Sequence, residues 1–164
     1  MKTPLKTLAV ALSLLSSFTS LSTHALPQGS ELKAGAAAWN VFDDVDRYAM
    51  HVAYIHKPLT SFYGLRPTVL LDNADKGQHY YAAGIAKDVY EYESFSVRLA
   101  FHAGIVDESE NLGDTIEFYS SIAALYNVTD DVSLEAEIGH ISNGGLGDTN
   151  PGSESFVLSG HYRF

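Results

Sequence analysis

The 164-residue chain has no cysteine and little positive charge. Without cysteine, neither a disulfide scaffold nor thiolate chemistry is available. Lys and Arg number 10 against 20 Asp and Glu, so the net charge is −10 and we expect no nucleic-acid partner. Charged residues make up only 18% and hydrophobic residues 46%, which excludes an intrinsically disordered chain. The length fits a single domain.

Long hydrophobic runs are also lacking. An apolar run over Leu8–Leu15 follows two lysines and precedes small polar residues that end at Ala25. This order is typical of a secretory signal peptide, whereas a spanning helix needs roughly 20 apolar residues. We therefore expect a signal peptide over residues 1–25 and a mature domain over residues 26–164. That domain would be either soluble outside the cytoplasm or embedded in a membrane by means other than a helix.

What the chain does contain is a series of aromatic and aliphatic segments separated by turn-forming clusters. Ten Tyr and eight Phe favour strands. Seven turn-forming clusters, six of them with Asp, Asn, Gly or Pro, delimit eight segments. Each is about ten residues, which is long for a soluble strand but suits a tilted strand crossing a bilayer. The predicted strands cover residues 31–41, 47–56, 61–71, 79–90, 95–105, 115–126, 132–142 and 154–164.

The connections and the alternation along the strands both favour a transmembrane barrel. Connections after the second, fourth and sixth strands are short, at about four or five residues, and those after the fifth and seventh are longer, as in outer-membrane barrels. Apolar side chains alternate with polar or small ones in segments 95–105, 132–142 and 154–164. In a small membrane barrel the polar set faces the lumen and the apolar set meets lipid, whereas a soluble barrel or sandwich buries the apolar set.

Three features favour the membrane barrel over the soluble barrel or sandwich. They are the strand length, the loop asymmetry and the closing Tyr162-Arg163-Phe164, which resembles the C-terminal signature of outer-membrane barrels. We predict an all-β, eight-stranded antiparallel up-and-down transmembrane β-barrel. Lys87 interrupts the apolar face of the fourth segment, and the first segment is rich in alanine. A bulge could therefore shift the register in either segment.

Three polar side chains fall on the lipid face at one rim of the predicted barrel. His140 and Ser142 continue the parity of Ile138, and Glu154 shares that of Phe156. Positions i and i+2 of a strand lie about 6.6 Å apart, and Glu154 would reach His140 from the adjacent strand. An imidazole oriented by a carboxylate can take the proton of a serine hydroxyl. Polar groups that face lipid are costly, so the three together indicate a candidate Ser-His-Glu triad. Taken singly, Ser142 could begin a turn, His140 could contact headgroups, and Glu154 could be a solvated loop charge.

Residues 139–155 resemble the active-site segment of the lipid A 3-O-deacylase (PagL) family of outer-membrane barrels. That family's pattern has His-x-Ser-Asn, a Gly two residues later, Asn-x-Gly and then Glu-Ser, with His and Glu fourteen positions apart. The residues that match in type and spacing are His140, Ser142, Asn143, Gly145, Asn150, Gly152, Glu154 and Ser155.

The resemblance implies a bacterial outer-membrane esterase that hydrolyses the 3-O-linked acyl chain of lipid A, with lipopolysaccharide as substrate and the site at the outer leaflet. By this resemblance Ser142 attacks the ester carbonyl, His140 acts as general base and then as general acid, and Glu154 orients His140. It also puts oxyanion stabilisation on backbone amides near Asn143 and Gly145, with Asn150 holding the loop.

Other residues form no recognisable site. The acids between Asp107 and Asp114 match no calcium loop, and the histidines have no metal-ligand spacing, so we expect no metal and no cofactor. His51, His102 and His161 fall on the lumen face, where we expect internal hydrogen bonds. Two further hypotheses stay open: a non-catalytic small barrel, such as an adhesin or structural protein, and a barrel phospholipase or acyltransferase. The sequence also leaves open whether the barrel forms a homodimer.

Overall fold

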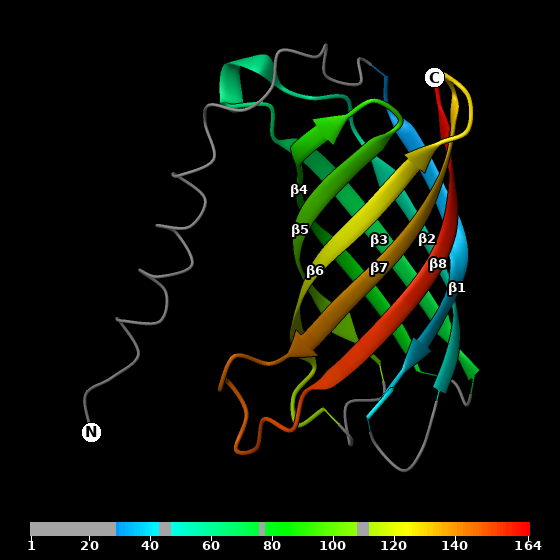
Figure 1. Cartoon of the computed structure of the whole chain (residues 1–164). Coiled ribbons are helices and arrows are strands. Elements are labelled where there is room, and N and C mark those ends of the chain that lie inside the picture. Colours follow the sequence, from blue (N-terminus) through cyan, green and yellow to red (C-terminus); the bar gives the residue numbers. More distant parts are fainter. Residues whose placement is uncertain (1–28, 43–46, 76–77, 108–111) are drawn as a thin grey trace.

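Eight antiparallel strands close into a barrel in chain order (Figure 1). The computed structural model describes residues 29–42, 47–75, 78–107 and 112–164, so the expected signal peptide lies outside the described residues. Each strand pairs with its neighbours in the chain, and β1 pairs with β8, which confirms the predicted fold class. The strands are β1 (Glu31–Trp39), β2 (Arg47–Ile55), β3 (Arg66–Ala74), β4 (His79–Tyr92), β5 (Phe95–Val106), β6 (Ile116–Asn127), β7 (Val132–Ser142) and β8 (Ser153–Arg163).

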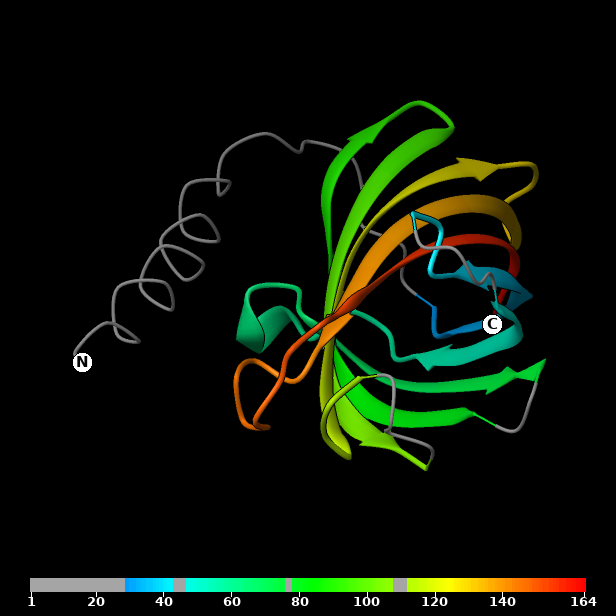
Figure 2. The same ribbon diagram turned by 90° about the horizontal axis from the view of Figure 1, so that it is seen from below.

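The two ends of the barrel differ in their connections. One end, called the turn end below, carries the C-terminus, the two-residue β4–β5 turn and the short β6–β7 turn. The opposite loop end carries the connection from Asn143 to Gly152 between β7 and β8, which extends beyond the strands in Figures 1 and 2. The predicted asymmetry is therefore present for these connections. The candidate triad lies at the loop end, because β7 ends and β8 begins there.

The β2–β3 connection is not the short turn that the sequence analysis expected. It runs from His56 to Leu65 and contains a 3-10 helix, η1 (Thr60–Phe62), so β3 begins five residues later than predicted. Tyr63 and Gly64 have φ values of 57° and 73°, left-handed conformations that end any extended strand. No helix in the described ranges is long and apolar enough to span a bilayer. The other strand bounds lie within three residues of those predicted.

A bulge in β4 lies just beyond Lys87, which itself still pairs in regular register with Leu99 of β5. Asp88 pairs with Arg98 of β5, but the next pair joins Tyr90 to Val97, so Val89 is an extra residue. The fourth strand, whose register the sequence left open, thus contains a bulge. The first strand, whose register the sequence also left open, pairs without interruption on both sides and has no bulge.

Charged side chains fill the lumen and most are paired there, although neither carboxylate oxygen of the buried Glu117 has a hydrogen-bond partner in the described residues. Lys33 Nζ lies 2.5 Å from a carboxylate oxygen of Glu135 and 2.8 Å from one of Glu137. Glu31 binds the Arg66 guanidinium at 2.7 Å and accepts a contact from His161 at 3.1 Å. Because a buried charge is costly unless it is paired, these ion pairs stabilise the charged part of the lumen, where no apolar core is present. Large apolar side chains instead lie exposed on the outer wall, as a membrane barrel requires and a soluble barrel does not.

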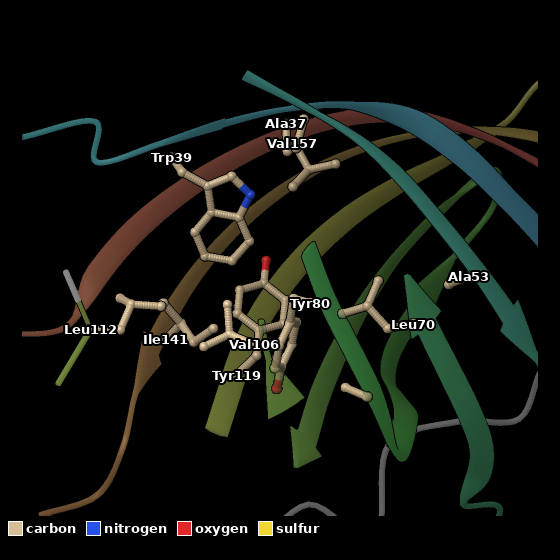
Figure 3. Packing of buried hydrophobic residues seen from close by; sticks show 12 residues of the cluster. Ala37, Trp39, Ala53, Leu70, Tyr80, Val106, Leu112, Tyr119, Ile141 and Val157 are labelled. Carbon is tan, nitrogen blue, oxygen red and sulfur yellow. The ribbon is translucent and has the colours of Figure 1, made fainter. Parts of the chain in front are cut away.

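An apolar cluster fills the part of the lumen behind the candidate triad (Figure 3). The Trp39 and Tyr119 rings lie 5.3 Å apart, and the Tyr119 hydroxyl donates to Glu137 at 2.6 Å. Ile141, which stands between His140 and Ser142 in β7, points into this cluster and is almost fully buried. Packing of Ile141 on the inside therefore turns its two neighbours to the outer face.

Candidate active site

His140 and Glu154 face each other across β7 and β8. They are directly paired in the antiparallel register, so their side chains leave the sheet on one side. Nδ1 of His140 lies 3.4 Å from Oε1 of Glu154, and the two side chains are 48% and 40% exposed. The expected convergence of these two residues is observed. Because Nδ1 faces the carboxylate, Nε2 is left for another partner.

Ser142 lies on the same outer face, two residues beyond His140 at the end of β7. It is half-buried and pairs with Phe118 of β6. Within the described part of the chain, no hydrogen bond joins Ser142 to His140. The strand rise puts the two α-carbons about 6.6 Å apart, so rotation of the two side chains can bring the Ser142 hydroxyl to the His140 ring. The structure thus places all three candidate residues on one face and brings His140 and Glu154 into contact.

The fully buried Asn143 organises the loop that follows β7. Its side-chain amide donates to the carbonyl oxygens of Leu112 at 3.1 Å and Thr149 at 2.7 Å. Its side-chain oxygen accepts the Gly145 N–H at 2.8 Å, and its own N–H donates to Oδ1 of Asn150 at 3.0 Å. Asn143 and Asn150 therefore tie the β7–β8 loop to itself and to the β5–β6 connection.

The same bonds determine which backbone donors remain beside Ser142. The N–H groups of Asn143 and Gly145 both donate to side-chain oxygens. Among these three consecutive amides, only that of Gly144 lacks a hydrogen-bond partner in the described residues. Gly144 and Gly145 have φ values of 66° and 83°, which glycine adopts without strain, so the loop can turn tightly at this point.

Gly152 leaves room for the imidazole of His140. A Cβ atom at this position would lie 2.8 Å from Cε1 and 3.3 Å from Nε2 of His140. The φ value of 70° at Gly152 also disfavours any other residue. The ring is therefore held between Glu154, on its Nδ1 side, and the backbone at Gly152.

Ser120 is a polar neighbour of His140 that the sequence analysis did not select. It pairs directly with His140 from β6, on the side away from Glu154, and is exposed on the outer face. Its apolar neighbour Phe118 stacks on Phe101 with ring centroids 6.0 Å apart. The alternation of segment 115–126 carried a signal for Ser120, but only the strand register shows that it lies opposite His140.

The acids of the β5–β6 connection accept hydrogen bonds from backbone amides where they are described, Asp107 from the start of β4 and Asp114 from its own turn. Asp107 accepts the His79 N–H at 2.7 Å, and Asp114 accepts the Ile116 N–H at 3.1 Å. Residues 108–111 lie outside the described residues. In the part of the chain that the structure describes, no group of three or more His, Cys, Asp or Glu side chains could hold a metal ion.

The fold and this polar row define a small outer-membrane-type barrel with a polar site on its outer wall, and solved structures support that class. The crystal structure of Neisserial surface protein A is 15% identical, covers 83% of this chain and 97% of its own, and has a TM-score of 0.60. That of the outer membrane enzyme PagL is 16% identical, covers 82% and 99%, and scores 0.58. The Yersinia pestis outer membrane protein Ail, 16% identical over 84% and 99%, scores 0.54. At these identities the likeness shows the fold alone.

The sequence identifies the family. The family model for lipid A 3-O-deacylase (PagL) matches residues 71–163, which is more than half of the chain and includes His140, Ser142 and Glu154. The chain therefore belongs to the lipid A 3-O-deacylase (PagL) family. No curated protein matches it significantly.

Proposed function

We propose that the protein is an outer-membrane esterase that removes the 3-O-linked acyl chain of lipid A through Ser142, His140 and Glu154. The observation that supports this most strongly is the 3.4 Å contact between His140 Nδ1 and Glu154 Oε1 on the outer wall of a barrel of this family. A site on the outer wall suits this substrate, because the acyl chains of lipid A already lie in the membrane and need not enter water.

In the proposed reaction Ser142 Oγ attacks the ester carbonyl while Nε2 of His140 takes the hydroxyl proton. Glu154 holds Nδ1 and stabilises the imidazolium that forms. The tetrahedral intermediate expels the sugar oxygen, which receives the proton from Nε2, and the acyl chain remains on Ser142. Water then hydrolyses this acyl-enzyme with His140 again as general base. We expect the Ser142–His140 hydrogen bond to form when substrate binds, since such contacts often tighten only in the complex.

The loop from Asn143 to Asn150 would stabilise the oxyanion. One fixed donor of this kind is commonly worth about 3 kcal/mol. The unpartnered N–H of Gly144 is available directly, whereas the N–H groups of Asn143 and Gly145 would first exchange their side-chain acceptors for the substrate oxygen. The side chains of Asn143 and Asn150 hold the loop that presents these donors.

The loop end would lie at the outer leaflet and the turn end in the periplasm. Short turns and the C-terminus at one end, with a long β7–β8 loop at the other, support this orientation. Lipopolysaccharide in the outer leaflet would then meet His140, Ser142 and Glu154 at the height of its ester linkages. Residues 1–25 would direct export as a cleaved signal peptide.

Mass spectrometry of lipid A tests the proposal in cells that have an outer membrane. We expect cells that express the parent protein to lose one 3-linked hydroxyacyl chain, and cells that express Ser142→Ala to retain it. Ser121→Ala is the matched control, because Ser121 lies on the neighbouring strand with lumen-facing parity. Intact lipid A with a folded parent barrel in the membrane would overturn the assigned substrate, and altered phospholipids in that case would indicate a phospholipase.

A further inference from the structure

The β2–β3 connection at the turn end exposes two aromatic side chains far from the candidate triad. Phe62 is 62% exposed and Tyr63 is 81% exposed. The β4–β5 turn at the same end needs only two residues to join its strands, whereas this connection uses ten, from His56 to Leu65. Joining two adjacent strands therefore does not account for its length or its aromatic content.

Backbone hydrogen bonds hold this connection in a defined shape. The Leu59 N–H donates to the Leu65 carbonyl at 2.9 Å, and the N–H groups of Phe62 and Gly64 donate to the Leu59 carbonyl at 2.9 and 3.0 Å. Tyr63 has a φ of 57°, which for a bulky residue costs roughly 1 to 2 kcal/mol. Because these hydrogen bonds maintain Tyr63 in the left-handed region, they fix the backbone from which the Phe62 and Tyr63 side chains project.

The connection extends sideways from the barrel. Figure 1 shows η1 beyond the wall at the turn end, and Figure 2, turned by 90°, again shows it outside the ring of strands. It therefore does not cover the lumen. In both views it lies on the same side of the barrel as the β7–β8 loop.

The surface beside this connection is already suited to a membrane interface. Aromatic residues gather at the interfaces of membrane barrels, because their rings prefer the boundary between headgroups and acyl chains. Seven exposed aromatic side chains lie near the turn end on the strands or at the C-terminus: Tyr54, Tyr90, Tyr92, Phe95, Tyr126, Tyr162 and Phe164.

We propose that the β2–β3 connection is a membrane-interface anchor whose Phe62 and Tyr63 rings insert at the headgroup boundary of the leaflet at the turn end. A phospholipid surface fits them because the tyrosine has an apolar ring with a polar tip, and the exposed Lys57 can meet anionic headgroups. Interfacial anchors determine barrel tilt, so this one would help to set the depth of the side that carries His140. The proposal requires a membrane-embedded barrel but no deacylase activity.

Site-directed spin labelling tests the anchor, since the chain has no native cysteine. Ser61→Cys places a nitroxide in η1, and Asp130→Cys places one in the acidic β6–β7 turn at the same end. In phospholipid vesicles that contain the anionic lipid phosphatidylglycerol, we expect the ratio of oxygen to water-soluble nickel-chelate collisions to be several-fold higher at position 61. Equal ratios at the two positions would overturn the proposal.

The contribution of the two rings is measured with the same label. Combining Ser61→Cys with Phe62→Ser and Tyr63→Ser should lower the collision ratio to the value found at position 130. An unchanged ratio in a barrel that still shows heat-modifiable mobility would refute the assignment to these rings. If the triple variant does not fold, the comparison of positions 61 and 130 in the parent sequence decides the question. The readout is independent of catalysis, so failure of the anchor and failure of the deacylase assignment are distinguishable.

Discussion

Replacing Glu154 by glutamine separates orientation of His140 from the rest of the proposed mechanism. The substitution preserves the shape of the side chain but removes the charge that faces Nδ1 at 3.4 Å. Loss of a buried triad carboxylate commonly lowers kcat by about 10⁴-fold. Here the glutamate is 40% exposed and the contact is long, so solvent replaces part of its effect. We expect kcat to fall by about 10² to 10³-fold, equivalent to about 3 to 4 kcal/mol of transition-state stabilisation.

The assay is release of 3-hydroxy fatty acid from lipopolysaccharide by the purified, reconstituted protein, with kcat and KM measured separately. KM should change little, because Glu154 acts through His140. Thermal stability should also be maintained, since exposed ion pairs contribute at most about 1 kcal/mol. Glu93→Gln, the same substitution in the exposed β4–β5 turn, is the control. A folded Glu154→Gln variant with the kcat of the parent would show that Glu154 does not orient His140.

Three further substitutions test the surroundings of the site and the lumen. Gly152→Ala should lower kcat in an intact barrel, because its Cβ would approach His140 Cε1 to 2.8 Å, whereas Gly160→Ala, with no atom within 4 Å, should leave kcat unchanged in the same assay. Asn143→Ala removes three hydrogen bonds worth about 1 kcal/mol each, so limited proteolysis should cut the β7–β8 loop faster; a loop as resistant as the parent's would contradict this role. Lys33→Met leaves the buried carboxylates of Glu135 and Glu137 without their lysine, so the free energy of unfolding should fall by about 3 to 5 kcal/mol. Urea titrations measure this, and an unchanged midpoint would count against the ion pairs.

The sequence predicted those features that follow from a period of two and from local turn chemistry. Alternation in segment 132–142 placed His140 and Ser142 on the outer face, and β7 has the predicted bounds. The β2–β3 connection was missed because the apolar residues from Phe62 to Leu65 look like the start of a strand, whereas the left-handed residues Tyr63 and Gly64 prevent one. Alternation cannot reveal such a local conformation.

Cross-strand partners lay beyond sequence reasoning for a different physical reason. Whether Ser120 lies opposite His140 depends on the register of β6 against β7, and a shift of one residue would move Ser120 to the lumen. The bonds of Asn143 to Leu112 and Thr149 likewise join two connections that are remote in sequence. Family resemblance indicated the residue types of the site, but only the closed barrel shows which neighbours surround the imidazole.

The most direct test of the central claim is to identify the serine that reacts. The purified protein, reconstituted in vesicles containing lipopolysaccharide, is treated with a long-chain fluorophosphonate, digested and analysed by mass spectrometry. We expect an adduct on Ser142 in the parent and in Ser121→Ala, and none in His140→Ala. An active parent enzyme with no adduct on Ser142, or with the adduct on Ser120 instead, would contradict this expectation.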